Sequence, residues 1–201
     1  MLRPARGLIV PLIGVLTALG GPAVAQKLEV KSHVDPKADF SAIRTYAWLP
    51  PAPAVRAVAP DAVSNPTLTQ EALGPHIVAA VDKELARRGL TAGDRESADV
   101  HMVYFAALTV GFNQSYLGEH YGYITGWPSP IPPGLAPSTA MTVHEKGTVL
   151  VDMVQRAAKR GIWRGSVVTR IDQEKTLQQR IARIGEAVER MFERFPIRPR
   201  K

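Results

Sequence analysis

The chain has 201 residues, a length that suits one domain or two small ones. Hydrophobic residues make up 45% of it and charged residues 21%, which excludes a wholly disordered chain, a collagen-like fibre and a polytopic membrane protein. The formal net charge is +7, from 25 Lys and Arg against 18 Asp and Glu. Cysteine is absent, which excludes disulfides, thiol catalysis, thiolate metal sites and the cysteine that carries the lipid of a lipoprotein.

The first 25 residues have the order of a secretory signal peptide. Arg3 and Arg6 supply a basic head, residues 7–20 carry no charge, and residues 23–25 form a small-x-small cleavage site. The apolar stretch is shorter than the roughly 20 residues that a membrane-spanning helix needs. We expect cleavage after Ala25, so that the mature chain reaches the periplasm without a lipid and without stable membrane insertion.

The positive charge of the mature chain is spread over two modest groups. They are Arg156, Lys159, Arg160 and Arg164 in the first, and Arg194, Arg198, Arg200 and Lys201 in the second. Nucleic-acid-binding surfaces concentrate more charge than this, and an exported protein rarely meets nucleic acid, so no nucleic-acid partner is expected. We interpret the first group as a solvated turn and residues 197–201 as a basic tail, with diffuse attraction to an anionic envelope surface as the alternative.

Two strands are predicted near the start of the mature chain. Apolar and polar residues alternate over residues 27–34, and this period of two indicates a half-buried strand. After the turn residues 35–39, residues 44–49 are rich in β-formers and end at two prolines, which cannot donate to a sheet. Residues 50–66 are mostly Pro, Ala and Val, and we interpret them as an extended surface linker.

A helix and a central strand are predicted next. The helix is expected to begin near Pro75, because the N–H that proline lacks is not needed in a first turn, and to end in a left-handed cap at Gly89. Its apolar stripe consists of Ile77, Val78, Val81 and Leu85. Residues 99–110 carry apolar side chains on both faces, which favours a central strand.

Residues 111–139 are predicted to form one long loop, because Gly and Pro are frequent there and no regular period appears. The loop carries four aromatic side chains: Tyr116, Tyr121, Tyr123 and Trp127. Aromatic residues supply a large contact area at a low entropic cost, so they suit interfaces. Two interpretations stay open: these residues form a surface for a protein partner or a glycan, or they lie on the open face of the sheet.

The last part of the domain is predicted to contain a hairpin and a further strand. In the hairpin, residues 141–145 pair with residues 148–154 around a turn at Lys146 and Gly147. Another turn leads to the final strand at residues 162–171.

A final helix is predicted at residues 174–195, where Thr176 and Gln179 have the spacing of a capping box. Its apolar stripe is Leu177, Ile181, Ile184, Val188 and Phe192. The element order favours an α+β fold, with a mainly antiparallel sheet of five or six strands and two helices packed on one face. Part of the other face would be solvated or covered by the long loop.

No arrangement typical of catalysis or metal binding stands out. The five histidines are His33, His76, His101, His120 and His144, and no two of them have the i, i+4 spacing of a helical metal site. No phosphate loop, dinucleotide fingerprint or Gly-x-Ser-x-Gly turn is present, so no cofactor or metal is expected. The alternative to a non-catalytic protein is an envelope hydrolase in which His101 or His144 pairs with Asp99 or Asp152.

Four segments together resemble the DUF4136 family, a domain of unknown function in bacterial envelope proteins. They are residues 39–50 (DFSAIRTYAWLP), 81–90 (VDKELARRGL), 146–152 (KGTVLVD) and 162–165 (IWRG). The resemblance spans about residues 27–196. Many members are lipoproteins with a cysteine after the signal peptide, and this chain lacks that cysteine. The resemblance therefore implies an envelope location and a fold, but neither an activity nor a membrane tether.

These observations predict a single domain at residues 26–196 after a signal peptide at residues 1–25. We expect an exported, non-catalytic module of the bacterial cell envelope. Its partner would be an envelope protein or a cell-wall polymer, bound through the aromatic residues of the long loop.

Overall fold

The computed structural model describes residues 28–51, 70–107, 118, 120–125, 146–170 and 175–198. The strands are β1 (Glu29–Val34), β2 (Thr45–Trp48), β3 (Thr91–Ala92), β4 (Val100–Ala107), β5 (Ile124–Thr125), β6 (Lys146–Gln155) and β7 (Arg160–Arg170). The helices are the 3₁₀ turn η1 (Phe40–Ala42), α1 (Gln70–Arg87) and α3 (Leu177–Phe192). The predicted signal peptide and most of the linker and of the long loop lie outside the described residues.

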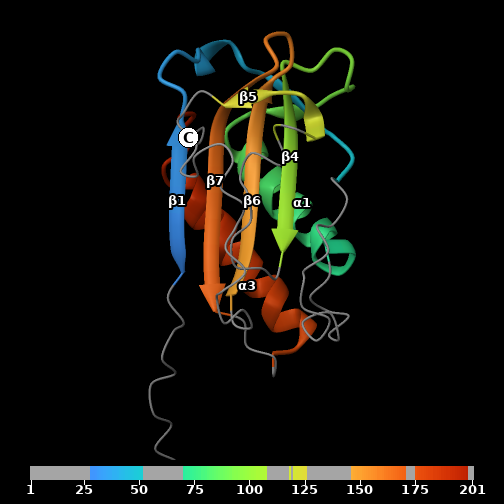
Figure 1. The fold of residues 1–201 in the computed structure, drawn as a ribbon, viewed down its shortest axis with the longest axis vertical. Coiled ribbons are helices and arrows are strands. Elements are labelled where there is room, and N and C mark those ends of the chain that lie inside the picture. The colour runs from blue at the N-terminus through green and yellow to red at the C-terminus, as the bar shows by residue number, and fades with distance from the viewer. Residues whose placement is uncertain are drawn as a thin grey trace, which may run out of the picture.

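The strands form one sheet in the order β1-β7-β6-β4-β2-β3, with β5 also paired to β7. The four strands from β1 to β4 in this order are antiparallel, whereas β2 runs parallel to both β4 and β3. Both α-helices lie behind the sheet in the view of Figure 1. The predicted α+β fold is confirmed. The described sheet has seven strands, whereas five or six were predicted. The strands β3 and β5 were not predicted, because two residues are too few to show a period.

The predicted start of the first helix is wrong. The helix α1 begins at Gln70, so Pro75 lies inside it. This first part of the helix packs closely on β4, since a Cβ atom on Gly74 would lie only 2.2 Å from the hydroxyl of Tyr104. The predicted end of the helix is confirmed, because Gly89 has a φ of 78°, in the left-handed region, and Leu90 is buried against the core.

The predicted turn at Lys146 and Gly147 is also wrong. Both residues belong to β6 and pair with Arg170 and Thr169 of β7. The hairpin that the structure does contain joins β6 to β7 through the turn at residues 156–159. A Lys-Gly pair is typical of a turn, but here pairing along the length of β7 keeps it in the strand. The strand predicted at residues 141–145 lies outside the described residues.

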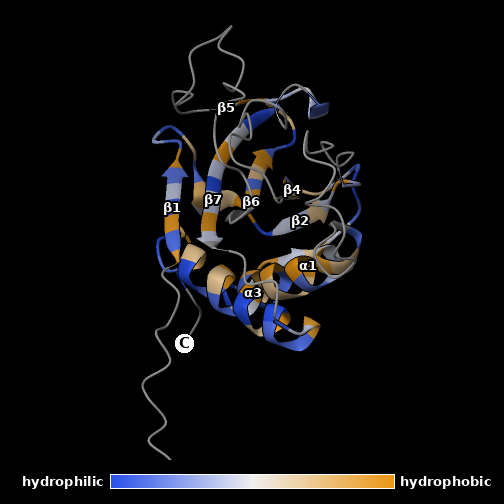
Figure 2. Ribbon diagram, turned by 60° about the horizontal axis from the view of Figure 1, so that its bottom comes forward, coloured by the Kyte–Doolittle hydropathy of each residue, from blue (hydrophilic) through white to orange (hydrophobic). Residues whose placement is uncertain are grey.

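A large apolar core fills the space between the sheet and the two α-helices. Apolar residues of α1 and α3 are buried in this core, and polar residues colour the side of α3 that faces away from the sheet (Figure 2). At its centre the fully buried ring of Trp163 lies 5.0 Å from that of Phe192 and 4.9 Å from that of Phe195, measured between centroids. Gly165, on the same face of β7, makes room for the Trp163 ring, because a Cβ atom there would lie 2.6 Å from it.

The final helix follows its predicted pattern. The side chain of Thr176 accepts a hydrogen bond from the backbone of Gln179, and the side chain of Gln179 accepts one from the backbone of Thr176, which completes the predicted capping box. Ile184, Val188 and Phe192 of the predicted stripe are buried. Among the described residues, no helix is both long enough and apolar enough to cross a membrane.

Candidate functional site

The sheet face that α1 and α3 leave uncovered has a buried ion pair at its centre. Asp152 of β6 and Arg164 of β7 are cross-strand partners in the antiparallel ladder. The Nε and Nη2 atoms of Arg164 donate to the two carboxylate oxygens of Asp152 at 2.6 and 2.5 Å, and the two residues are 1% and 0% exposed. This two-pronged geometry satisfies both carboxylate oxygens inside the protein.

Tyr123 closes over this pair. Its hydroxyl donates a hydrogen bond to Oδ2 of Asp152, and its side chain is buried. Burial raises the pKa of Tyr123 above its usual value, and the neighbouring charge of Asp152 raises it further. The ring also packs in a small apolar cluster with Val103, Phe105, Leu150 and Val154. Tyr123 therefore covers the ion pair, with its hydroxyl bonded to Asp152 and its ring packed on apolar residues of the sheet.

The segment that carries Tyr123 is attached to the sheet at two further points. The hydroxyl of Tyr121 donates to the backbone carbonyl of Pro50 at 2.6 Å. The strand β5 pairs in parallel with Arg160 and Gly161 of β7. In Figure 1, β5 passes in front of the upper part of the sheet, on the side away from the helices. Part of the predicted long loop thus covers the second face of the sheet.

His33 stands beside the ion pair, because it is the cross-strand partner of Arg164 on β1. Partial burial lowers the pKa of His33, and the positive charges of Arg164 and Lys31 lower it further, against the opposing effect of Asp152. No prediction from the sequence connected His33 with Asp152. The alternation around Trp163 and Gly165, which share one face of β7, was the signal that places Arg164 on the opposite face.

The first basic group forms only in part the solvated turn that was predicted. Arg164 is buried in the ion pair, and Arg160 donates to the buried carboxylate of Asp35. The Nε atom of Arg156 donates to the carbonyl of Ala98 at 2.7 Å. Of the four members, Arg156 and Lys159 keep the exposed positions in the turn that were predicted for all of them. The three arginines of the group hold strands and turns together, because backbone carbonyls and carboxylates lie within their reach in and beside the hairpin.

The residues predicted for a hydrolase have structural partners where they are described. The Nε2 atom of His101 lies 2.8 Å from the carbonyl oxygen of Arg95. The carboxylate of Asp99 accepts hydrogen bonds from the backbone N–H groups of Arg44 and Thr45, each at 2.8 Å, and these bonds hold the pKa of Asp99 below its usual value. His101 is opposite Val154 on β6, two positions along that strand from Asp152.

His144, Tyr116 and Trp127 lie outside the described residues. Within the described part of the chain, no group of three or more His, Asp or Glu side chains has the arrangement of a metal site. Tyr121 is half-buried and Tyr123 buried, so these two predicted interface residues turn toward the sheet. Their neighbour Ile124 is 65% exposed and presents an apolar side chain to solvent.

Comparisons with known proteins give two kinds of result. No curated protein matches the chain. Among solved structures, the PelC dodecamer from Paraburkholderia phytofirmans is 9% identical, with a TM-score of 0.43, and the match covers 87% of this chain and 100% of that one. A PDZ domain protein from Parabacteroides distasonis is 14% identical, with a TM-score of 0.46 and coverage of 87% and 38%. At the level of sequence families, residues 30–197 match DUF4136, a domain of unknown function, and the chain belongs to this family.

Proposed function

We propose that the chain is an exported domain of the bacterial cell envelope that binds a protein partner or a cell-wall polymer and does not catalyse a reaction. One observation carries the proposal. The segment of residues 120–125 is anchored to the sheet by Tyr121, Tyr123 and β5, and this anchoring leaves Ile124 65% exposed. A rigidly held apolar side chain at the surface suits an interface, because little conformational entropy is lost when a partner covers it.

A second residue with an exposed apolar side chain pairs with the same strand as Ile124. Val34 is 40% exposed and pairs with Trp163 of β7, while Ile124 pairs with Arg160 on the same strand. Since β6 occupies the other edge of β7, β1 and β5 share one edge, and the two pairing positions are three residues apart. Strand geometry places them about 10 Å from each other. We call Val34 and Ile124 the edge patch.

The absence of catalysis is supported by how the polar residues are used. Both oxygens of Asp152 are held by Arg164, and the Asp99 carboxylate is held by the start of β2. A general acid or base needs an oxygen or nitrogen within reach of a substrate proton. In both carboxylates these partners compete with a substrate for the oxygen atoms.

Binding through the edge patch is tested with the mature chain carrying Ile124→Asp. The probes are purified peptidoglycan sacculi, by co-sedimentation, and envelope proteins, by crosslinking in intact cells. We expect the wild-type chain to bind one of the two probes and the variant to bind at least about tenfold more weakly, since a carboxylate would have to be desolvated in the interface. Ala79→Asp is the matched control, because Ala79 is exposed on α1. Binding to neither probe, or equal binding by all three proteins, would contradict the proposal.

Catalysis is tested separately by incubating the mature chain with generic ester, phosphate and glycoside substrates. We expect no turnover above that of buffer. Activity that disappears in His101→Ala or Asp99→Asn would establish the hydrolase alternative instead.

Export is tested by N-terminal sequencing of the protein recovered from the periplasm, where Gln26 is the expected first residue and an intact Met1 would refute cleavage.

A further inference from the structure

A cavity of about 390 Å³ lies where three segments of the chain meet. These segments are residues 40–44 around η1, residues 88–89 at the end of α1, and residues 196–198 after α3. The volume falls within the range of roughly 300–1,000 Å³ in which proteins hold small ligands. None of the residues that line the cavity belongs to the edge patch or to the Asp152 pair.

The wall of the cavity combines apolar and cationic side chains. The apolar side chains are those of Phe40, Ile43, Pro196 and Ile197, and the cationic ones are those of Arg44, Arg88 and Arg198. Among the described residues, no carboxylate lines the cavity. An anionic group beside a short apolar segment is the ligand chemistry that matches both kinds of wall.

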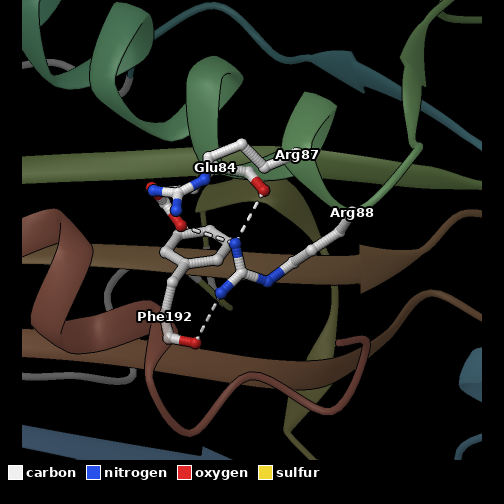
Figure 3. Close-up of polar contacts among 4 residues, drawn as sticks. All are labelled: Glu84, Arg87, Arg88 and Phe192. Carbon is white, nitrogen blue, oxygen red and sulfur yellow. Dashed lines mark hydrogen bonds and ion pairs between the residues drawn. The ribbon is translucent and has the colours of Figure 1, made fainter. Parts of the chain in front are cut away.

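Hydrogen bonds to Glu84 and Phe192 hold the guanidinium of Arg88 in a fixed position (Figure 3). Arg88 is 6% exposed, its Nη1 donates to the carbonyl and the carboxylate of Glu84, and its Nη2 donates to the carbonyl of Phe192 at 2.9 Å. The guanidinium carbon lies 5.1 Å from the centroid of the Phe192 ring. These contacts join the ends of α1 and α3 and fix the position of the charge.

The Nε atom of Arg88 is buried and has no hydrogen-bond partner. A buried N–H group without an acceptor is unfavourable, and most such groups in folded proteins have a partner. Because this atom is buried, it is not open to the cavity, and Arg44 and Arg198 supply the donors that an anion in the cavity can reach.

Arg44 and Arg198 contribute charge from the exposed rim. Arg44 is oriented by hydrogen bonds from its Nη1 to the carbonyls of Ser41 and Ile43, at 2.6 and 2.8 Å. Within the described part of the chain, no carboxylate hydrogen-bonds the guanidinium of either residue. Asp39 and Asp99 act on Arg44 through their charge, but each accepts hydrogen bonds from other groups. The rim therefore offers two guanidinium groups to an incoming anion.

We propose that this cavity binds a small anionic amphiphile, whose carboxylate or phosphate oxygens contact Arg44 and Arg198 and whose apolar part packs on Phe40 and Ile43. Arg fits such oxygens because its planar guanidinium presents several donors in fixed directions. The site is independent of the edge patch, so the two proposals stand or fall separately.

The test is an NMR titration of the mature chain with four probes: hexanoate, hexyl phosphate, inorganic phosphate and 1-hexanol. We expect saturable shifts of the Gly89 and Ile197 amide signals with hexanoate or hexyl phosphate, and affinity at least about tenfold higher than for inorganic phosphate or hexanol. The stronger of the two amphiphiles identifies the head group as carboxylate or phosphate. No saturable shift with either amphiphile, or equal affinity for hexanol, would overturn the proposal.

Three matched substitutions locate the site. Arg198→Gln and Arg44→Gln each remove a proposed contact and should weaken binding of the better amphiphile about tenfold. Arg194→Gln removes the same charge from an exposed residue of the same C-terminal segment that does not line the cavity, and should change affinity less than about twofold. Equal affinity of all four proteins, with unchanged circular dichroism, would contradict a site at this cavity.

Discussion

One face of the sheet is covered by α1 and α3, and the other by the short segment of residues 120–125. The helix-covered face buries a continuous apolar core that includes Trp163, Met191 and Phe192. The second face has a much smaller apolar cluster, around an ion pair that is completely buried. The helices are thus held on one face by apolar packing, and residues 120–125 are held on the other by a small apolar cluster and a hydrogen bond to the ion pair.

The difference shows how each layer is specified. On the helix-covered face, stability follows from apolar area removed from water, and many similar packings would provide it. On the second face, taking Asp152 and Arg164 out of water is unfavourable unless their hydrogen-bonding groups are satisfied. Tyr123 supplies one of those hydrogen bonds. The ion pair therefore favours residues 120–125 in this position over a purely apolar segment, which could not donate the hydrogen bond to Asp152.

The largest effect is expected from Asp152→Asn. The variant leaves the guanidinium of Arg164 buried without a counter-charge, and the free energy of unfolding should fall by about 3–5 kcal/mol. Urea denaturation followed by circular dichroism measures this change. In the double variant Asp152→Leu with Arg164→Met, most of the stability should return, because both charges are gone. A loss of less than about 1 kcal/mol in the single variant would show that the pair is not specified in this way.

On the helix-covered face, Gly165→Ala should lower the free energy of unfolding by about 1–3 kcal/mol. The added Cβ atom would lie 2.6 Å from the Trp163 ring and 3.0 Å from the sulfur of Met191. Gly185→Ala is the matched control, because a Cβ atom there meets nothing within 4 Å and α3 should gain about 0.5–1 kcal/mol. Thermal melting of both variants gives the comparison, and equal melting temperatures would argue against tight packing around Trp163.

A smaller effect is expected from Tyr123→Phe, which removes only the hydroxyl that donates to Asp152. We expect a loss of about 1–2 kcal/mol, because Arg164 still binds the carboxylate. Tyr121→Phe, which removes the hydrogen bond to the Pro50 carbonyl at a half-buried site, should cost about 0.5 kcal/mol. The reverse order of the two losses in urea denaturation would mean that Tyr121, and not Tyr123, anchors the covering segment.

The smallest effect concerns the pH dependence of stability through His33. Its pKa in the folded chain lies below the ordinary value of 6.5, so the unfolded chain binds more protons as the pH falls through about 6.5. The free energy of unfolding should therefore decrease from pH 7.5 to pH 5.5, and His33→Gln should reduce that decrease. Denaturation of both proteins at the two pH values tests the sign. A steeper decrease in the variant would mean that Asp152 outweighs Arg164 and Lys31 at this position.

Local patterns in the sequence were enough to predict much of the fold. The alternation in β1, the stripe and capping box of α3, and the left-handed end of α1 at Gly89 all depend on neighbouring residues, and the structure confirms them. The two wrong predictions of element boundaries, at Pro75 and Gly147, concern residues that ordinarily interrupt regular structure. In both places pairing or packing with a distant segment outweighs the local preference.

Amphipathic periods in the sequence were sufficient to predict the fold class, because they are local and show which side of each element is buried. The way in which those buried sides are joined follows from the packing of the whole chain. Tyr123 meets Asp152 across 29 residues, and Arg88 meets the carbonyl of Phe192 across 104. Such contacts depend on how the elements pack in three dimensions, which no local period encodes. The ion pair and the arginine-lined cavity therefore became visible only when the sheet and its helices were assembled.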